Sequence, residues 1–365
     1  MSLEIGIVGL PNVGKSTLFN ALTQAGAAVA SYPFTTIEPN VGVVPVEDKR
    51  LTNIAALVKP EKVVPTTVRF VDIAGLVKGA HRGEGLGNQF LGHIRNVDAI
   101  AMVVRCFEAS DIPHVTPELD PTSDVETVDM ELILADLATV ERRIEKVRGS
   151  AKAHPREYAD ELTWLERLRV HLDNGALARG FAETERETAW ERELNLLTAK
   201  PRLYVANIGE EDCPEGGVLV SRVATRAAAE GAQVVTVCAQ VEMDLLEWPS
   251  DEAAAYLAEM GMAESGLQRL VHAGYRLLGL ITFFTTTGGR VVQAWMVRQG
   301  THAPQAAGNV HTDMERGFIR AEVLAYDDLV VAGSVVAARE KGLLRLEGKE
   351  YIVQDGDVIH FRFAV

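Results

Sequence analysis

Eight residues near the N-terminus, G-L-P-N-V-G-K-S at 9–16, have the types and spacing needed to hold a phosphate chain. They fit G-x-x-x-x-G-K-[ST], in which glycines let backbone N–H groups point at phosphate oxygens. Lys15 is expected to reach the β- and γ-phosphates, and Ser16 to ligate Mg²⁺. A plain glycine-rich turn between a strand and a helix is the alternative. The context favours the phosphate site, because an apolar run at 5–8 precedes the loop and a helix-like run at 17–24 follows it.

A second phosphate-related signal is D-I-A-G at 72–75, at the end of an apolar stretch predicted to be a buried strand. A carboxylate there can hold the Mg²⁺ shell and a glycine N–H can meet the γ-phosphate, so Asp72 is a predicted metal ligand. Thr36 lies between the two motifs, where a switch threonine is expected. An ordinary turn residue at a strand end is the alternative role for Asp72.

A third signal concerns the base and lies at N-I-G-E, 207–210, just past the apolar run 202–206. A guanine-binding site uses N-K-x-D, whose aspartate accepts the two donors of the guanine Watson–Crick edge. Here Ile208 takes the lysine position, and the longer Glu210, which need not reach that edge, takes the aspartate position. Asn207 is expected to bond the exocyclic amine and N7 of adenine. The pattern favours ATP over GTP, and a GTPase with a degenerate base motif is the alternative.

These signals together define one nucleotide site with a metal, expected to bind ATP with Mg²⁺ and GTP more weakly. The residues assigned to the nucleotide are Asn12, Val13, Gly14, Lys15, Ser16, Thr17, Asn207, Ile208, Glu210, Cys238 and Ala239. The residues assigned to the metal are Ser16, Thr36 and Asp72.

The elements that must position these residues form an α/β domain. Near-continuous Val/Ile runs separated by helical segments are typical of a parallel sheet that is covered on both faces. Strands are predicted at Leu3–Val8, Gly42–Val46, Thr67–Asp72, Ala99–Phe107, Arg202–Ala206 and Gln233–Cys238.

A helical segment interrupts this domain. Apolar residues recur at heptad spacing in a first run, and a break near 149–155 separates it from a second run. The first run contains Met130, Ile133, Leu137, Val140, Ile144 and Val147; the second contains Leu162, Leu165, Leu168 and Leu172. The pattern predicts an antiparallel helical hairpin. The stretch 142–156, with six basic residues and one acidic residue, then lies near its tip. This stretch is either an RNA-binding patch or a solvated helix face.

The C-terminal part changes character again. Thr282–Thr287 and Arg290–Val297 flank Gly288-Gly289 and predict a β-hairpin, and another strand and turn are expected within 351–361. We infer a small separate β-rich domain.

Composition limits the class of protein. A chain of 365 residues with 47% hydrophobic and 24% charged residues is ordinary for a globular protein of two or three domains. No apolar run approaches the ~20 residues that span a membrane, so no membrane partner is expected. A strand begins almost at the N-terminus, and Cys106, Cys213 and Cys238 have neither metal nor disulfide spacing. We therefore expect a cytoplasmic protein, whose net charge of −15 requires a local basic patch for any RNA contact.

Several long strings resemble the YchF/Obg-like ATPase family of translation-factor-class P-loop proteins. Besides the loop at 9–16, these strings are P-F-T-T-I-E-P-N (33–40), D-I-A-G-L-V-K-G-A (72–80), G-E-G-L-G-N-Q-F (83–90), the N-x-x-E of 207–210 and A-P-Q-A-A-G-N-V-H-T-D (303–313). The resemblance covers essentially the full length. It implies a P-loop G-type domain in two parts, 1–127 and 200–279, with a coiled-coil arm at 128–199 inserted between them. A β-grasp-like TGS domain at 280–365 follows.

The resemblance also implies activity and partners. It implies ATP hydrolysis in preference to GTP, association with the ribosome or a ribosomal subunit, and a role in translation or stress, with 142–156 and the TGS domain as RNA contacts. Lys15 and His114 are the implied catalytic residues. Leu76, which cannot hydrogen-bond, stands where Ras-type GTPases have a glutamine, and His81 and His93 are the other candidates. Asn12 is expected to support a K⁺ ion, or simply to cap a turn. A third interpretation is a nucleotide-gated ribosome- or RNA-binding module with incidental hydrolysis.

Overall fold

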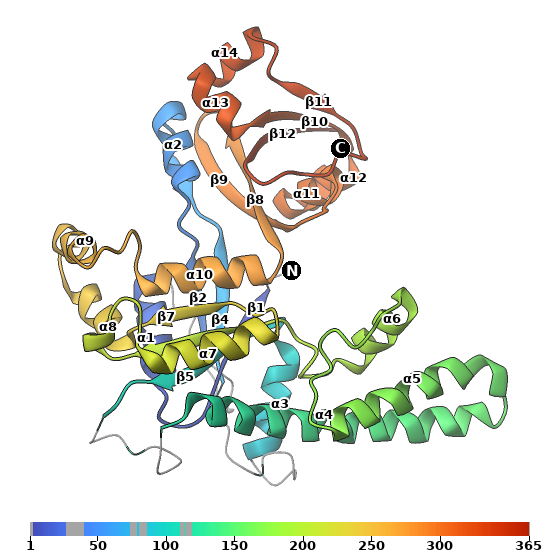
Figure 1. Ribbon diagram of the computed structural model, residues 1–365. Coiled ribbons are helices and arrows are strands. Elements are labelled where there is room, and N and C mark those ends of the chain that lie inside the picture. The colour runs from blue at the N-terminus through green and yellow to red at the C-terminus, as the bar shows by residue number, and fades with distance from the viewer. Residues whose placement is uncertain are drawn as a thin grey trace. The chain divides into compact units, whose positions relative to one another are not determined.

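A computed structural model describes residues 3–26, 40–73, 79, 86–109, 113 and 119–364 (Figure 1). The chain divides into two compact units, one of Met1–Val44 with Arg69–Gly274 and one of Pro45–Val68 with Tyr275–Val365. No helix in the described part of the chain is both long enough and apolar enough to cross a lipid bilayer.

The first unit is built on a six-stranded sheet in the order β2-β4-β1-β5-β6-β7. Its strands are β1 (Glu4–Val8), β2 (Asn40–Pro45), β4 (Thr67–Asp72), β5 (Ala99–Cys106), β6 (Arg202–Ile208) and β7 (Val234–Val237). Its helices outside the arm are α1 (Lys15–Gly26), α3 (Leu86–Asn96), α7 (Val218–Ala229), α8 (Ala239–Glu247), α9 (Ser250–Glu259) and α10 (Gly266–Leu277). The strands from β4 through β7 pair in parallel, and every residue of β5 and β6 is buried. All six predicted strands are confirmed, with bounds shifted by at most two residues.

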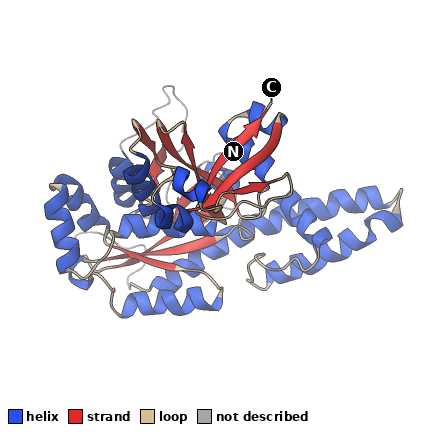
Figure 2. Cartoon of the chain, turned by 90° about the horizontal axis from the view of Figure 1, so that it is seen from above, coloured by secondary structure: helices blue, strands red, loops and turns tan. Residues whose placement is uncertain are grey.

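A helical arm leaves the first unit between β5 and β6. It consists of α4 (Pro121–Ala151), α5 (Pro155–Asp173) and α6 (Glu185–Leu194), and the long pair α4 and α5 extends away from the sheet (Figures 1 and 2). Asp120 caps α4 by accepting the N–H of Thr122 at 3.0 Å, and Pro121 occupies the first turn. The predicted helical hairpin is confirmed.

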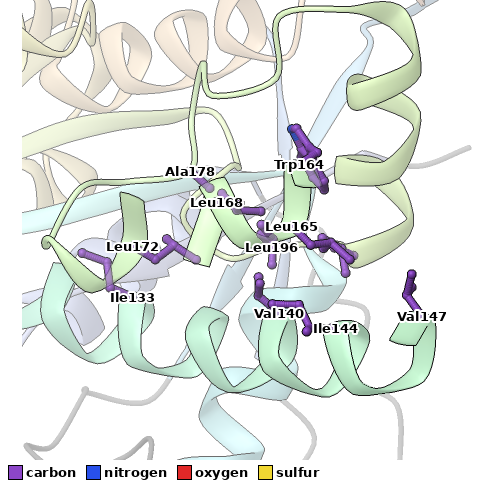
Figure 3. Packing of buried hydrophobic residues seen from close by; sticks show 11 residues of the cluster. Ile133, Val140, Ile144, Val147, Trp164, Leu165, Leu168, Leu172, Ala178 and Leu196 are labelled. Carbon is purple, nitrogen blue, oxygen red and sulfur yellow. The ribbon is translucent and has the colours of Figure 1, made fainter. Parts of the chain in front are cut away.

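Apolar side chains from both long helices form the core of the arm. Val140 and Ile144 of α4 face Leu165 and Leu168 of α5, and Trp164 packs above them (Figure 3). Met130 is the exception in the predicted seam, with half of its surface exposed. Met130 lies in the N-terminal third of α4, outside the apolar cluster that α4 forms with α5. Within the predicted heptad repeat, Ile133 is therefore the first residue whose side chain is buried.

The second unit is a six-stranded sheet in the order β11-β10-β12-β8-β9-β3. Its elements are α2 (Lys49–Val58), β3 (Lys62–Val64), β8 (Leu280–Thr287), β9 (Val291–Arg298), α11 (Ala303–Val310), α12 (Thr312–Arg316), β10 (Phe318–Ala325), α13 (Tyr326–Ala332), α14 (Val335–Glu340), β11 (Arg345–Glu347) and β12 (Asp357–Phe363). The predicted hairpin is the antiparallel pair β8 and β9. The C-terminal β-rich domain is confirmed.

Residues 45–68 differ from the expected domain assignment. We expected all of 1–127 in the nucleotide domain, but this stretch belongs to the second unit. β3 pairs in parallel with β9, and Leu51 and Ile54 of α2 join the apolar cluster that contains Phe284 and Val292. The physical reason is that a short edge strand and an amphipathic helix gain burial from whichever sheet they reach, however distant in sequence.

Candidate nucleotide site

The phosphate-binding loop connects β1 to α1, as its pattern predicts. Gly14 has φ +93°, and a Cβ built on it would lie 2.1 Å from Nδ2 of Asn207, so only glycine fits this position. Asn12 also has a positive φ of 61° and donates from Nδ2 to the carbonyl of Pro113 at 3.1 Å. The loop is therefore held by contacts from segments about 100 and 200 residues away.

Lys15 and Asp72 form the charged end of the site. The Lys15 ammonium is buried and donates to the carbonyl of Leu10 at 2.6 Å. Burial lowers the pKa of Lys15 to about 8, and the nearby carboxylate of Asp72 opposes that shift. Burial also raises the pKa of Asp72, while the charge of Lys15 lowers it. A phosphate oxygen is a stronger acceptor for a buried ammonium than a neutral carbonyl, so a bound phosphate can replace the carbonyl of Leu10.

The donor set suits a hard divalent cation. Asp72 ends β4, directly beside β1 in the sheet, and Ser16 lies in the first turn of α1. Within the described ranges, no hydrogen bond to the Asp72 carboxylate is found. Carboxylate and hydroxyl oxygens are the ligands that Mg²⁺ takes beside phosphates. The Asp72 carboxylate and the Ser16 hydroxyl therefore have the chemistry of ligands for a divalent cation.

A cavity of about 500 Å³ opens at the carboxyl edge of the sheet, next to the loop. It is lined by Asn12, Gly14, Lys15, Ser16, Thr17, Phe107, Asn207, Ile208, Gly209, Glu210, Cys238, Ala239 and Gln240. Because the parallel strands β1, β5, β6 and β7 all end at this edge, the loops that follow them meet there. All predicted nucleotide residues except Val13 line this cavity.

Asn207 lines the cavity and also has a structural role that was not predicted. Its Nδ2 donates to the carbonyl of Val13 at 2.9 Å, and its Oδ1 accepts the backbone N–H of Ala239 at 3.1 Å. These two contacts tie the phosphate loop to the start of α8. They leave one acceptor site on the amide oxygen and one amide hydrogen, so the predicted contact of Asn207 with the base stays a prediction. Val13, which does not line the cavity, takes part through its backbone carbonyl, which accepts from Nδ2 of Asn207.

The base end of the cavity combines apolar walls with an exposed carboxylate. Ile208 is buried, whereas Glu210 is exposed at the rim. Cys238 caps α8, and its thiol pKa is lowered by a hydrogen bond from Cys213 and by N–H groups of the first helical turn. All three cysteines are free thiols.

Three lining residues were not predicted: Phe107, Gly209 and Gln240. Phe107 follows β5, and its orientation is fixed by Arg105, whose guanidinium lies 4.6 Å from the ring centre and whose Nε donates to the Phe107 carbonyl at 3.1 Å. An aromatic residue at the carboxyl end of a buried strand was the available signal. Gln240 carries no comparable signal in the sequence.

Some predictions fall outside the described residues. These are Thr36, Gly75, Leu76, His81 and His114. Of the three candidate histidines, the structure describes His93, which lies on α3 and does not line the cavity.

Comparisons with known proteins cover the whole chain. Residues 4–135 match a family model described as 50S ribosome-binding GTPase, and residues 280–364 match the model YchF-GTPase_C, described as a protein of unknown function (DUF933). The chain is 52% identical to the ribosome-binding ATPase YchF of Bacillus subtilis and 49% identical to the protein of the same name from Escherichia coli O157:H7, each over 100% of both chains. The solved structure of the Schizosaccharomyces pombe YchF GTPase is 34% identical and matches with a TM-score of 0.86, covering 99% of this chain and 98% of that chain.

Proposed function

The chain belongs to the YchF family, and from that membership we propose that it is a ribosome-binding ATPase of the cytoplasm. The observation that carries the proposal is the 500 Å³ cavity in which the phosphate loop meets the ends of β6 and β7. Its size falls within the usual range of small-molecule sites. Lys15 at one end and Ile208 and Glu210 at the other are arranged for the phosphates and the base of one nucleotide.

Lys15 and the loop N–H groups would bind the β- and γ-phosphates. The cation we propose is Mg²⁺, held by Ser16, Asp72 and Thr36, and it would neutralise charge on the phosphates when bound. His114 is our proposed water-orienting residue, because Leu76 cannot hydrogen-bond a water. K⁺ near Asn12 is a further proposal. Without a glutamine or an arginine finger, we expect intrinsic turnover on the order of 10⁻² s⁻¹ or less.

Selection of adenine is proposed to follow from Ile208 and Glu210. A lysine at 208 would cover a guanine, and an aspartate at 210 would be held at the guanine edge; neither is present. GTP remains the second candidate, because the solved relative and the matching N-terminal family model both carry the word GTPase in their descriptions.

The test is titration calorimetry with ATP and GTP in the presence of Mg²⁺. We expect wild-type protein to prefer ATP, and the Ile208→Lys/Glu210→Asp variant to shift toward GTP. The control Val218→Lys/Glu252→Asp introduces the same two residue types at exposed positions that do not line the cavity. A wild-type preference for GTP above about tenfold, ~1.4 kcal/mol, would replace the ATPase proposal by a GTPase.

The arm tip is a weaker RNA surface than its own sequence predicts. Arg143 pairs with Glu161 and with Glu193 of α6, at 2.6 and 3.0 Å, and Arg148 pairs with Glu166 of α5 at 3.0 Å. Across 142–166 six basic residues face five acidic ones. The second helix therefore neutralises much of the charge carried by the first.

A sheet face in the second unit brings three arginines together with one glutamate. Arg320 on β10 lies directly opposite Arg362 on β12, and Glu322 lies opposite His360 on the same face. Glu322 is buried under Arg362 and Arg339, at 3.1 and 3.0 Å. Within the described residues Arg320 has no carboxylate partner. We propose this arginine face, defined by Arg320, Arg339, His360 and Arg362, as an RNA contact on the ribosome.

Co-sedimentation with ribosomes tests the arginine face. Arg320→Glu/Arg362→Gln is expected to weaken binding. The slope of log affinity against log salt concentration should fall by the amount that about one to two phosphate contacts contribute. Arg316→Glu, an exposed change in the same unit, is the control. If Arg142→Glu/Lys152→Glu abolishes binding while the arginine-face variant binds normally, the contact lies at the arm tip instead.

The binding-module alternative has its own test. Lys15→Ala is expected to abolish hydrolysis and to change how ribosome binding responds to ATP. Ribosome binding that responds to ATP as in wild type, without turnover, would favour a module in which hydrolysis is incidental.

A further inference from the structure

A buried carboxylate on the arm helix contacts the segment that follows Asp72. Oε1 of Glu131, in α4, accepts the backbone N–H of Gly79 at 2.7 Å, and Glu131 is only 4% exposed. Gly79 has φ +92°, a conformation that favours glycine. Gly79 lies seven residues after the predicted metal ligand, so one hydrogen bond joins the arm to the D-x-x-G stretch.

A second contact joins the same two parts of the molecule. Arg95, near the end of α3, donates to the hydroxyl of Thr139 on α4 at 2.9 Å. The Arg95 carbonyl accepts from Asn195 and from the Lys200 ammonium, at 3.1 and 3.0 Å, in the segment where the chain returns from the arm. Gly79 and the C-terminal end of α3 therefore both contact the arm or the segment that returns from it.

Packing of the arm does not account for a charged group at 131. The apolar cluster of the hairpin begins at Ile133, and burying a carboxylate costs free energy unless donors compensate it. A hydrogen bond to an ionised acceptor is stronger than a neutral one. The hydrogen bond from Gly79 is therefore one of the contacts that compensate the buried Glu131 carboxylate.

The helix that carries Glu131 is long and uninterrupted. Twenty residues separate Glu131 from Ala151 at the end of α4, which corresponds to about 30 Å. A change in the position of Gly79 would act on this helix at Glu131, between its contacts through Asp129 to Arg202 and through Asp136 to Thr198. In nucleotide-dependent switches, the stretch after D-x-x-G changes with the presence of the γ-phosphate.

We propose that Glu131 is a positioning residue that couples the nucleotide state at Asp72 to the helical arm through the backbone N–H of Gly79. The coupling rests on the proposed ATPase function and adds to it a route by which the arm senses the γ-phosphate. In the reverse direction, a partner that holds the arm would bias the Asp72 segment and so change turnover.

The test compares Glu131→Ala, which removes the acceptor, with Glu131→Gln, which keeps an oxygen in the same place. Glu126→Ala, an exposed glutamate on the same helix, is the matched control. Hydrogen exchange is followed at Gly79 and along 121–140 with ADP and with a non-hydrolysable ATP analogue and Mg²⁺. ATP turnover is measured on the same samples.

We expect Gly79 to exchange at least about tenfold faster in Glu131→Ala, and the difference between the ADP and ATP-analogue states along 121–140 to disappear. kcat should fall about tenfold while KM for ATP stays within about twofold. Glu131→Gln should retain most of both signals, and Glu126→Ala all of them. A purely structural role would instead lower the melting temperature and leave the state-dependent difference intact.

Two results would overturn the coupling: a wild-type arm whose exchange is the same in both nucleotide states, or a Glu131→Ala variant that keeps the full difference. Loss of the difference together with rescue by Glu131→Gln supports it. A wild-type protein that turns over no ATP would refute the ATPase proposal itself, and the exchange experiment would still decide the coupling.

Discussion

Removing the phosphate-binding lysine should stabilise the nucleotide-free protein. Lys15 is 7% exposed, and its pKa is lowered from 10.5 to about 8, mainly because burial disfavours the charged form. The difference between these two pKa values corresponds to about 3 kcal/mol of unfavourable free energy for keeping the charge at pH 7. Lys15→Met removes that term but also breaks the hydrogen bond to Leu10, which costs about 1–2 kcal/mol.

The net gain expected at pH 7 is about 1–2 kcal/mol, or roughly 2–6 °C in melting temperature for a unit of this size. The sign with pH follows from the direction of the shift. A lysine whose folded pKa is lowered destabilises the protein fully below about pH 8, and the penalty is lost as pH rises toward 10.5. The advantage of Lys15→Met should therefore shrink by about 2 kcal/mol between pH 7 and pH 9.5.

The assay is thermal unfolding at both pH values, with and without Mg²⁺ and ATP. The variant should melt higher than wild type without nucleotide and show no ATP-dependent shift. Lys152→Met, an exposed lysine at the arm tip, should change stability by less than about 0.5 kcal/mol. A variant that melts lower than wild type at pH 7, or whose advantage does not depend on pH, would refute the reasoning about the buried charge.

Other predictions concern the same unit. ATP affinity measured by calorimetry should weaken about tenfold from pH 7 to pH 9, because Lys15 loses its proton above about pH 8. If the affinity does not change over this pH range, the charge of Lys15 does not contribute to ATP binding. Gly14→Ala should cost at least about 2 kcal/mol in denaturant unfolding, because its Cβ would meet Asn207 at 2.1 Å; Gly231→Ala, with φ +64° but open space around it, should cost only about 1 kcal/mol, and equal costs would contradict the steric argument. Asn207→Asp replaces the donor to Val13 by a carboxylate facing a carbonyl, so the ATP-dependent thermal shift should be lost, and a normal shift would show that the tie between the loop and α8 is dispensable. Asp129→Ala leaves the buried Arg202 with less compensation and should destabilise the first unit by about 3–5 kcal/mol in urea unfolding, whereas a loss below 1 kcal/mol would mean that Glu230 suffices.

Much of the fold could be predicted from the sequence because its signals are local. The buried strands appear as continuous apolar runs, and the arm as a heptad pattern broken before Pro155. The phosphate loop depends on a few glycines and a lysine within eight residues, so its conformation is encoded where it lies. The sequence also predicted that 9–16 and 207–210 lie close together, because the carboxyl ends of parallel strands meet at one edge of the sheet.

The roles that were missed or changed all depend on contacts between distant residues. The sequence could not show that Asn207 joins Val13 to Ala239, or that Arg143 pairs with Glu161. Nor could it show that 45–68 joins a sheet more than 200 residues away.

Sequence by itself therefore determined the chemistry of the phosphate end and the order of the elements, because spacing along the chain fixes which groups a loop or a helix face presents. Tertiary structure alone decided which of those groups remain free for a ligand. The donors and acceptors of a side chain form hydrogen bonds with the backbone and charged groups that pack against it. Glu131, for example, accepts the N–H of Gly79, which lies 52 residues earlier in the sequence. Buried polar groups form such hydrogen bonds because burying them without a partner costs free energy. Local sequence patterns do not show which distant group will be that partner.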